Sequence, residues 1–377
     1  MKVPGVTVLM CSLLASCLGE PYAVGRAPPP EAPAPIPLAP PPPESAVQIA
    51  AQSYDTCVRT AGLGTFCTGL SSGSDGALRP ALPGVEAPWQ VQRLSQHNGI
   101  GFVVADVVGD ERPAMLQPSG SLDALRRLLV AEVVRHPDFG GVQGVAGMRG
   151  DVFAWTHAGE LFCAGECRVL APGLVTRQGT VAALPGIREV ALGSEHACAL
   201  LANGKVQCWG DNRHAQCGTG NLIGAHPRTQ VEWVPAASSV AAGTDFTCVV
   251  QLNGVAFCWG GEGPEIAGGV LHRAADGMPE VAQLSFGALH GCALRTDGAV
   301  DCWGMGPAAG SARPTESLTR VPIPPARRLV SGLAHTCAAT ADGAVWCWGG
   351  NAYGELGARP GEAHDAAHPV ALLRVPR

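Results

Sequence analysis

This chain has little charge and few aromatic residues for its length. Of its 377 residues, 15% are charged and 5% are aromatic, and lysine occurs only at Lys2 and Lys205. The formal net charge is −6, and the sequence has no run of lysine and arginine. Because a protein without a basic surface cannot neutralise many phosphates, we expect no nucleic-acid partner.

Several membrane and catalytic signals are also missing. Beyond the N-terminus no apolar stretch reaches the ~18 residues that a transmembrane helix needs. The sequence has no His-Glu-x-x-His, no Walker loop, no Gly-x-Ser-x-Gly and no dinucleotide fingerprint. We therefore assign no catalytic residue, no metal and no cofactor, although an active site can arise without any of these motifs.

The first residues have the pattern of an export signal. A positive start, Met1-Lys2, is followed by an apolar stretch over residues 6–14 and by Leu-Ala-Ser-Cys17. The last four residues resemble a bacterial lipobox, which implies a signal peptide over residues 1–16 and acylation of Cys17. The residue after Cys17 is not Asp, which favours the outer membrane or cell surface over the inner membrane. An ordinary signal peptide and a cytosolic apolar start are the alternatives.

A proline-rich spacer, residues 17–45, follows the predicted anchor. Ten of the seventeen residues from 27 to 43 are proline. Proline fixes φ and lacks a backbone donor, so this stretch cannot join a sheet and favours an extended polyproline conformation. At ~3.1 Å per residue it would span roughly 50 Å and hold a domain clear of a membrane. A ligand for a proline-binding domain is the other interpretation.

A repeated Cys-x9-Cys-Trp-Gly unit dominates the remainder of the chain. Four gap-free copies begin at Cys198, Cys248, Cys292 and Cys337, each with Gly six positions after the first Cys. Weaker copies begin at residues 57, 103 and 153, so that the unit recurs about every 45 to 50 residues. With 50 Gly and 32 Pro, the composition also favours turns and strands over helices. We predict an all-β fold, a seven-bladed β-propeller over residues 46–377.

Each strong copy is predicted to be a β-hairpin closed by a three-residue turn. With Gly204 as the left-handed residue of the turn, Leu200 faces Val206 and Cys198 faces Cys208. Directly opposed cysteines lie within disulfide range. The same register gives the complete set of predicted disulfides, Cys57–Cys67, Cys198–Cys208, Cys248–Cys258, Cys292–Cys302 and Cys337–Cys347.

Two other interpretations of these cysteines were weighed. They could be reduced thiols packed as small apolar side chains, but export to an oxidising compartment favours disulfides. Zinc is disfavoured because each hairpin supplies only two thiolates, whereas a structural zinc site normally has four ligands. Cys163 and Cys167 could close a small loop, and Cys217 is expected to be unpaired.

The two ends of the repeat region predict how the ring closes. The C-terminal segment, residues 368–376, resembles His226-Pro-Arg-Thr-Gln-Val, interpreted here as the opening strand of a unit. The first unit begins at Ala46 without such a strand. We therefore expect the C-terminal strand to complete the first blade, which would lock the N-terminal and C-terminal blades together.

The repeat resembles the RCC1 (regulator of chromosome condensation) family. The resemblance is carried by Val-Ala-Ala-Gly before the first Cys, by the Asn/Asp-Gly turn, by Cys-Trp-Gly and by the Asn351-Ala-Tyr-Gly-Glu-Leu-Gly357 tail. It covers residues 46–377 and is most specific in the last four units. It implies a seven-bladed propeller and diverse functions, which include nucleotide exchange on a small GTPase and inhibition of enzymes. It transfers no catalytic residue to this chain.

The function favoured by the sequence is a non-catalytic binding module of the cell envelope. We expect it to be a monomer that presents a propeller face to a protein or glycan partner and meets the membrane only through its lipid anchor. The alternative is a hydrolase or lyase acting on envelope polysaccharide through carboxylates at the central channel. The turns before each first Cys predict the binding rim, with candidates Tyr54, Asp55, Arg149, Glu195, Asp245, Phe246, His290 and His335. The histidines, which share one repeat position, can also be hydrogen-bonded turn elements.

Overall fold

The structure is a computed structural model, and its described residues belong to one compact unit, Pro35–Arg377. Predictions for residues 1–16, Cys17, the spacer 17–45, Arg149 and Cys167 lie outside the described residues, as does the side chain of Cys163. Within the described ranges, no helix is long and apolar enough to cross a membrane. These ranges are 46–52, 54–60, 64–70, 75–80, 89–95, 101–107, 115–119, 142–148, 151–156, 159–164, 180–184, 186–224, 226–261, 278, 280–366 and 369–373.

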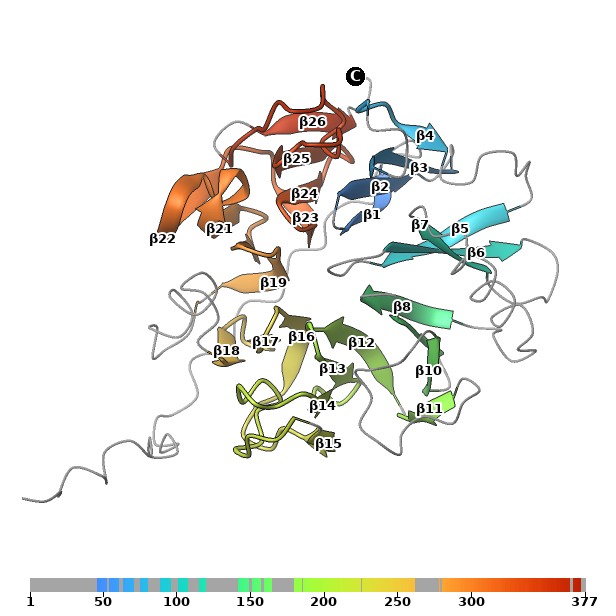
Figure 1. The fold of residues 1–377 in the computed structure, drawn as a ribbon, viewed down its shortest axis with the longest axis vertical. Helices are drawn as coiled ribbons and strands as arrows, with labels where there is room; N and C mark the ends of the chain where they lie inside the picture. The colour runs from blue at the N-terminus through green and yellow to red at the C-terminus, as the bar shows by residue number, and fades with distance from the viewer. Residues whose placement is uncertain are drawn as a thin grey trace, which may run out of the picture. The chain divides into compact units, whose positions relative to one another are not determined.

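The fold is all-β, and in the described residues the strands form seven antiparallel sheets of three or four strands (Figure 1). Within each sheet the strands lie side by side in chain order. The first three sheets are β1 (Ala46–Gln52), β2 (Asp55–Thr60), β3 (Gly64–Gly69) and β4 (Arg79–Pro80); β5 (Trp89–Ser95), β6 (Gly101–Val107) and β7 (Met115–Ser119); and β8 (Val142–Met148), β9 (Asp151–Thr156), β10 (Glu160–Ala164) and β11 (Thr180–Ala183).

The four C-terminal sheets correspond to the four strong copies of the repeat. Among these four sheets, β16–β18 has three strands and the others have four. A short 3-10 helix, η2 (Pro307–Ala309), follows β21. The strands are β12 (Ile187–Leu192), β13 (His196–Leu201), β14 (Val206–Gly210) and β15 (His226–Gln230); β16 (Ala237–Ala242), β17 (Phe246–Gln251) and β18 (Ala256–Gly260); β19 (Val281–Phe286), β20 (His290–Arg295), β21 (Val300–Gly306) and β22 (Ser311–Val321); and β23 (Ala326–Ser331), β24 (His335–Thr340), β25 (Val345–Gly349) and β26 (Val370–Leu373).

The pairing of residues across the hairpin is the predicted one. Leu200 is paired with Val206 and Cys198 with Cys208, and Gly204 in the turn has φ of 79°. The φ value lies in the left-handed region, where glycine has no Cβ penalty. All five predicted cysteine pairs are disulfides in the structure, with Cα–Cα distances of 4.0 to 4.1 Å. Cys217 is free and buried.

The prediction that the C-terminal strand completes the first sheet is wrong. β26 pairs with β25 inside the last sheet, and the first sheet has its own fourth strand, β4. The error lies in the assignment of the His-Pro strand, because β15 pairs with β14 of its own unit and does not open the next unit. In the units with four described strands the outer strand is thus the last strand of its own unit, and the C-terminal strand belongs to the last sheet.

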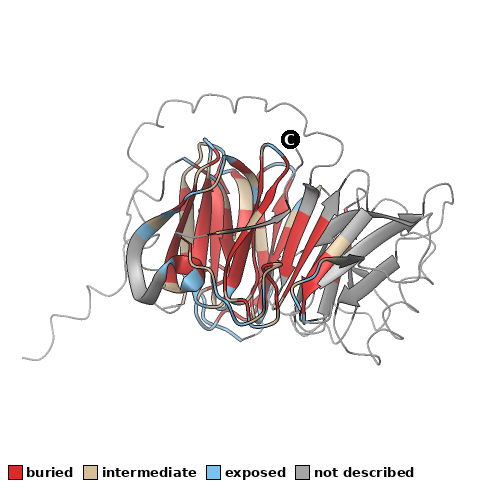
Figure 2. Cartoon of the chain, turned by 90° about the horizontal axis from the view of Figure 1, so that it is seen from above, coloured by how far each residue is buried: buried red, intermediate tan, exposed pale blue. Residues whose placement is uncertain are grey.

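Buried residues lie along the strands of the described sheets (Figure 2), and their side chains form apolar clusters shared by neighbouring sheets. The inner strand β1 contacts β5 of the next sheet and also β23 and β24 of the last sheet. The first and last sheets also share an apolar cluster that contains Ile49, Val58, Val330 and Leu356. The N-terminal and C-terminal sheets of the repeat region are therefore neighbours, held by side-chain packing and not by a shared strand.

Candidate functional site

In the four C-terminal sheets, the turn between the first (inner) strand and the second strand lies beside the loop that follows Cys-Trp-Gly. The backbone N–H of Asp211 donates to Glu195 O, that of Met305 to Leu289 O, and that of Gly350 to Ala334 O. Turns of adjacent sheets are also linked, since Ser194 N donates to Thr244 O. We call this surface the loop face. It comprises the turn residues Tyr54, 194–195, 244–245, 288–289 and 333–334, and the loops 211–224, 305–310 and 350–366.

Three of the predicted rim residues lie on the loop face. Glu195 is exposed, and Tyr54 and Asp245 are partly exposed. The ring of Tyr54 meets the ring of Tyr353 edge-on, with centroids 4.9 Å apart. Leu289, which is 42% exposed, occupies the equivalent turn position in its own unit. This position, three residues before the first Cys, is therefore the one that each unit presents in its turn.

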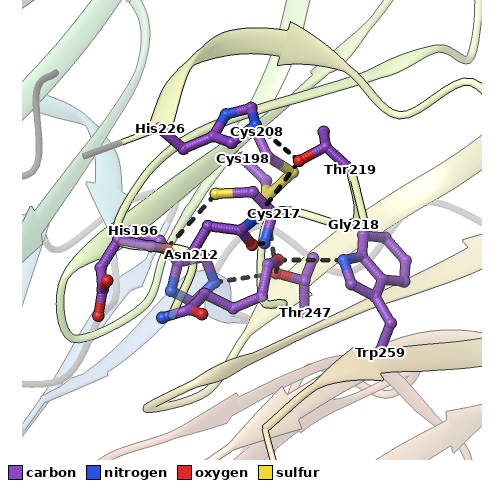
Figure 3. The surroundings of a disulfide bond; sticks show 12 residues. His196, Cys198, Cys208, Asn212, Cys217, Gly218, Thr219, His226, Thr247 and Trp259 are labelled. Carbon is purple, nitrogen blue, oxygen red and sulfur yellow. Dashed lines mark hydrogen bonds between the residues drawn. A yellow bond between two sulfur atoms is a disulfide. The ribbon is translucent and has the colours of Figure 1, made fainter. Parts of the chain in front are cut away.

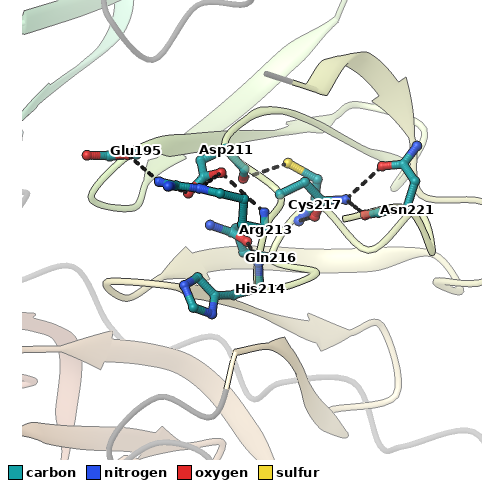
Figure 4. A network of polar contacts seen from close by, with 8 residues as sticks. Glu195, Asp211, Arg213, His214, Gln216, Cys217 and Asn221 are labelled. Carbon is teal, nitrogen blue, oxygen red and sulfur yellow. Dashed lines mark hydrogen bonds and ion pairs between the residues drawn. The ribbon is translucent and has the colours of Figure 1, made fainter. Parts of the chain in front are cut away.

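Arg213 is the centre of a charged cluster on the loop face that the sequence did not reveal (Figure 4). Its guanidinium bonds both oxygens of Asp211, at 2.9 and 3.0 Å, and reaches Glu195 at 3.2 Å. Burial raises the pKa of the Asp211 carboxyl, but the hydrogen bonds from Arg213 outweigh it and hold that pKa below its usual value. Asp245 adds a further negative charge near the guanidinium. We call Glu195, Asp211, Arg213 and Asp245 the Arg213 cluster.

Four predicted rim residues are buried, so their assignment to the rim is corrected. They are Asp55 (6% exposed), Phe246 (8%), His290 (2%) and His335 (0%). Each lies two residues before the first Cys, and side chains two apart point to the same side of a strand. Because that Cys points between sheets, the residue two before it does so as well.

The buried histidines join neighbouring sheets: they are hydrogen-bonded, as the alternative interpretation predicted, but each begins a strand and bonds to the next sheet and not within its turn. His196 Nε2 lies 2.9 Å from Thr247 Oγ1, beside the Cys198–Cys208 disulfide (Figure 3). The same bond recurs between His290 and Thr336 at 2.7 Å, and between His335 and Thr56 at 2.9 Å. The last of these joins the C-terminal sheet to the N-terminal one.

Loops after Cys-Trp-Gly also attach to the following sheet. The indole N–H of Trp259 and the hydroxyl of Thr247 both donate to Gln216 O, at 3.0 and 2.8 Å. In the last unit, Gly354 O accepts a hydrogen bond of 2.7 Å from Thr68 of the first sheet. The side-chain oxygen of Asn351 accepts from Leu356 N within its loop, so the family-like tail has a structural role.

Three buried ionisable groups, His290, His335 and Cys217, have pKa values far from neutral pH. Burial lowers the pKa of His290 to about 4, and burial followed by the charge of His290 lowers that of His335 to about 3. Burial, with a smaller effect of the Asp211 charge, raises the pKa of the Cys217 thiol to about 12. Both histidines are therefore neutral, and the thiol is protonated. Among the described residues no group of His, Cys, Asp and Glu could hold a metal ion.

On the inner strands β12 and β19, the third residue bonds to the inner strand of the next sheet, and in β12 this residue is a carboxylate, Glu189. Glu189 accepts hydrogen bonds from Val240 N and Ser239 Oγ, both at 3.2 Å, and burial raises its pKa. Gln283 makes the equivalent contacts with Leu329 N and O, at 3.0 and 2.9 Å. Glu189 and Gln283 thus play the same structural role, since each hydrogen-bonds its inner strand to that of the next sheet. The corresponding described residues of other sheets, Ser239, Gln283 and Arg328, are not carboxylates.

Comparisons with known proteins agree with this repeat architecture. Models described as "Regulator of chromosome condensation (RCC1) repeat" match residues 187–216, 281–307 and 327–355 in one case and residues 203–250 in another. No curated protein matches this chain in sequence.

Solved structures with a similar fold come from human and plant proteins. Human WBSCR16 is 19% identical with a TM-score of 0.54, covering 88% of this chain and 83% of that one. The ectodomain of the Physcomitrella patens receptor kinase CR4 is 20% identical with a TM-score of 0.52, covering 81% and 73%. The CRINKLY WD40 ectodomain of the Arabidopsis thaliana receptor kinase ACR4 is 18% identical with a TM-score of 0.50, covering 81% and 96%. At these identities the likeness shows the fold alone.

Proposed function

Because this chain carries RCC1 repeats, we propose that residues 46–377 form a closed seven-bladed β-propeller that binds a protein partner on its loop face. In this proposal the propeller is a non-catalytic module, and the partner contacts the exposed turn residues and the Arg213 cluster.

The contrast between constant strands and variable turns carries the proposal. The paired cysteines recur in five sheets, whereas the turn residue three before the first Cys is Tyr54, Glu195, Asp245, Leu289 or Ala334. Binding residues are concentrated on loops that a rigid scaffold positions. A surface that combines an aromatic residue, an arginine and apolar side chains has the composition of protein-binding sites.

The contacts between the first and last sheets support a closed ring. His335 bonds to Thr56, Thr68 bonds to Gly354 O, and Tyr54 packs on Tyr353. The first of these contacts repeats the histidine–threonine bond that joins β13 to β17 and β20 to β24. Closure by repeated side-chain contacts would leave only short sheet edges, as in other propellers.

The proposed setting is the cell envelope. The lipobox-like sequence at Cys17 and the proline-rich spacer support a monomeric lipoprotein whose propeller stands clear of the membrane. If this is right, changing Cys17→Ser abolishes incorporation of a fatty-acyl label while the wild-type chain is labelled.

The polysaccharide-cleaving alternative has weaker support. It needs two facing carboxylates, about 5 to 10 Å apart. Of the equivalent inner-strand positions in sheets β12–β15, β16–β18, β19–β22 and β23–β26, only the one in β12 carries a carboxylate, Glu189.

A charge-exchange experiment tests the binding face. In the double variant Glu195→Lys with Arg213→Glu, the net charge is unchanged but the charge order of the Arg213 cluster is reversed. We expect recovery of crosslinked envelope proteins to fall about tenfold, because a charged partner would meet like charges. The control, Lys205→Glu with Glu232→Lys, exchanges charges on exposed residues away from the loop face. Undiminished recovery by the first variant, with both variants folded, would contradict the proposed face.

A further inference from the structure

The five disulfides of the described residues differ in whether an outer strand is paired beside the second cysteine. In four sheets the strand carrying that cysteine is paired with an outer strand. The backbone pairs at these positions are Cys67↔Arg79, Cys208↔Thr229, Cys302↔Thr319 and Cys347↔Val370. An outer strand thus covers the side of these cysteines that faces away from their disulfide partners.

The Cys248–Cys258 disulfide lacks this cover in the part of the chain that the structure describes. Here β18 pairs with β17 on one side, and its other side carries only the bridge Ala256↔Met278. The residue Cys258 is partly exposed, whereas Cys248 and the other eight disulfide cysteines are each at most 5% exposed. Cys258 is therefore the accessible end of the most accessible of these disulfides.

The chemistry of disulfide exchange gives this difference a consequence. A thiolate attacks one sulfur from the side opposite to the sulfur that leaves, so the approach to the attacked sulfur has to be open. For Cys258, which is partly exposed, that approach lies on the side of β18 away from Cys248, where the described residues place no strand beside it. In the four sheets with an outer strand, both cysteines of each disulfide are at most 5% exposed, so this approach is closed in the folded chain.

We propose that Cys248–Cys258 is a redox-accessible site of this protein, reduced by a dithiol reductant that attacks Cys258. A thiolate of the dithiol forms a bond to Cys258 Sγ and breaks the Cys248–Cys258 bond, and Cys248 leaves as a thiolate that takes up a proton. The second thiolate of the dithiol then attacks the mixed disulfide and releases Cys258. The dithiol is oxidised to a disulfide, and its two electrons reside on the two protein thiols.

Reduction of the native chain by dithiothreitol, followed by alkylation and peptide mapping, tests the site. We expect Cys248 and Cys258 to be labelled about tenfold faster than Cys292 and Cys302, with a rate that rises linearly with dithiothreitol, because covered disulfides react only after local opening. The Cys292–Cys302 pair of the neighbouring sheet is the matched control. Equal rates for the two pairs, or earlier labelling of Cys292 and Cys302, would overturn the proposal.

A variant separates the site from general loosening of the fold. In the double variant Cys248→Ser with Cys258→Ser, the fast phase should disappear and the slow rates of the other four disulfides should remain. If a fast phase persists at any of those four disulfides in the folded variant, the proposal is wrong. If the variant does not fold, the mapping of the wild-type chain decides the matter alone. Either result is independent of whether the loop face binds a protein.

Discussion

Neighbouring sheets of this protein are joined in two chemically different ways. Three junctions use a histidine and a threonine, as His196 and Thr247 do. At the junction between β17 and β20, Phe246 stands in place of the histidine and Gly291 in place of the threonine. There the ring of Phe246 meets that of Phe286 edge-on, with centroids 5.0 Å apart. This junction is thus apolar, whereas the three His–Thr junctions are hydrogen-bonded.

The comparison shows that three positions change together. The residue paired with each threonine is small: Ala51 with Thr56, Ala242 with Thr247, and Ser331 with Thr336. At the apolar junction the pair is Phe286 with Gly291. The second phenyl ring occupies the space that a threonine side chain would need. The junction chemistry is therefore set by a group of three residues from two adjacent units, although the backbone pairing is the same.

The largest effect is expected from placing a threonine in the apolar junction. A Cβ at Gly291 would lie 2.6 Å from Trp303 and 3.0 Å from Phe286. Gly291→Thr should therefore lower the free energy of unfolding by about 3 kcal/mol, because the buried rings cannot move without strain. Denaturant unfolding measures the loss. Adding Phe246→His and Phe286→Ala, which rebuilds the other kind of junction, should restore part of it. A triple variant less stable than Gly291→Thr would contradict the claim that these three positions together determine the type of junction.

The two kinds of junction should also respond differently to acid. His290 and His335 have pKa values of about 4 and about 3 in the fold, below the value of about 6.5 for a free histidine. The unfolded chain therefore binds more protons between pH 6.5 and pH 4, and stability falls as the pH falls. We expect each of these two histidines to contribute a loss of about 2 kcal/mol between pH 7 and pH 5.

His335→Gln is the control for this pH dependence. Glutamine can still donate to Thr56 but does not titrate, so the variant should lose less stability on acidification than the wild-type chain. Because Phe246 does not titrate, Phe246→Leu should leave the slope of stability against pH unchanged. Identical slopes for wild type and His335→Gln would contradict the assignment.

A smaller effect is expected at a hydrogen-bonded junction when only the hydroxyl is removed. Thr247→Val keeps the side-chain shape but leaves His196 Nε2 and Gln216 O without this partner. The free energy of unfolding should fall by about 1 to 2 kcal/mol, measured by denaturant unfolding. The matched change Thr229→Val, at an exposed outer-strand residue, should cost less than about 0.5 kcal/mol. Equal losses would show that the junction bond contributes nothing.

The local features of this fold could be predicted from the sequence, and the relations between units could not. The ten-residue offset predicts the Cys198–Cys208 pairing because hairpin register depends only on the turn between the two strands. It does not say which sheet His226–Gln230 joins, since the same strand can follow one hairpin or precede the next. The coupling of Phe246 with Phe286 and Gly291 becomes visible only once the units are known to be neighbours.

The candidate site was predicted in part for a similar reason. The turn position was found at Tyr54, Glu195 and Asp245, but the strand alternation that buries His290 and His335 was not applied to the residue next to each turn. Arg213 was missed because its loop has no constant length among the units. Its only local signal was the neighbouring Asp211, one of several acidic residues near a turn.

Ring closure is tested most directly by a double-mutant cycle between His335 and Thr56, which lie 279 positions apart in sequence. The cycle compares His335→Phe, Thr56→Val and the double variant by denaturant unfolding. If the first and last sheets meet as described, the coupling is about 1 kcal/mol and similar to that of His196 with Thr247. Additive effects, within about 0.3 kcal/mol, would show that these residues do not touch and would contradict the closed ring.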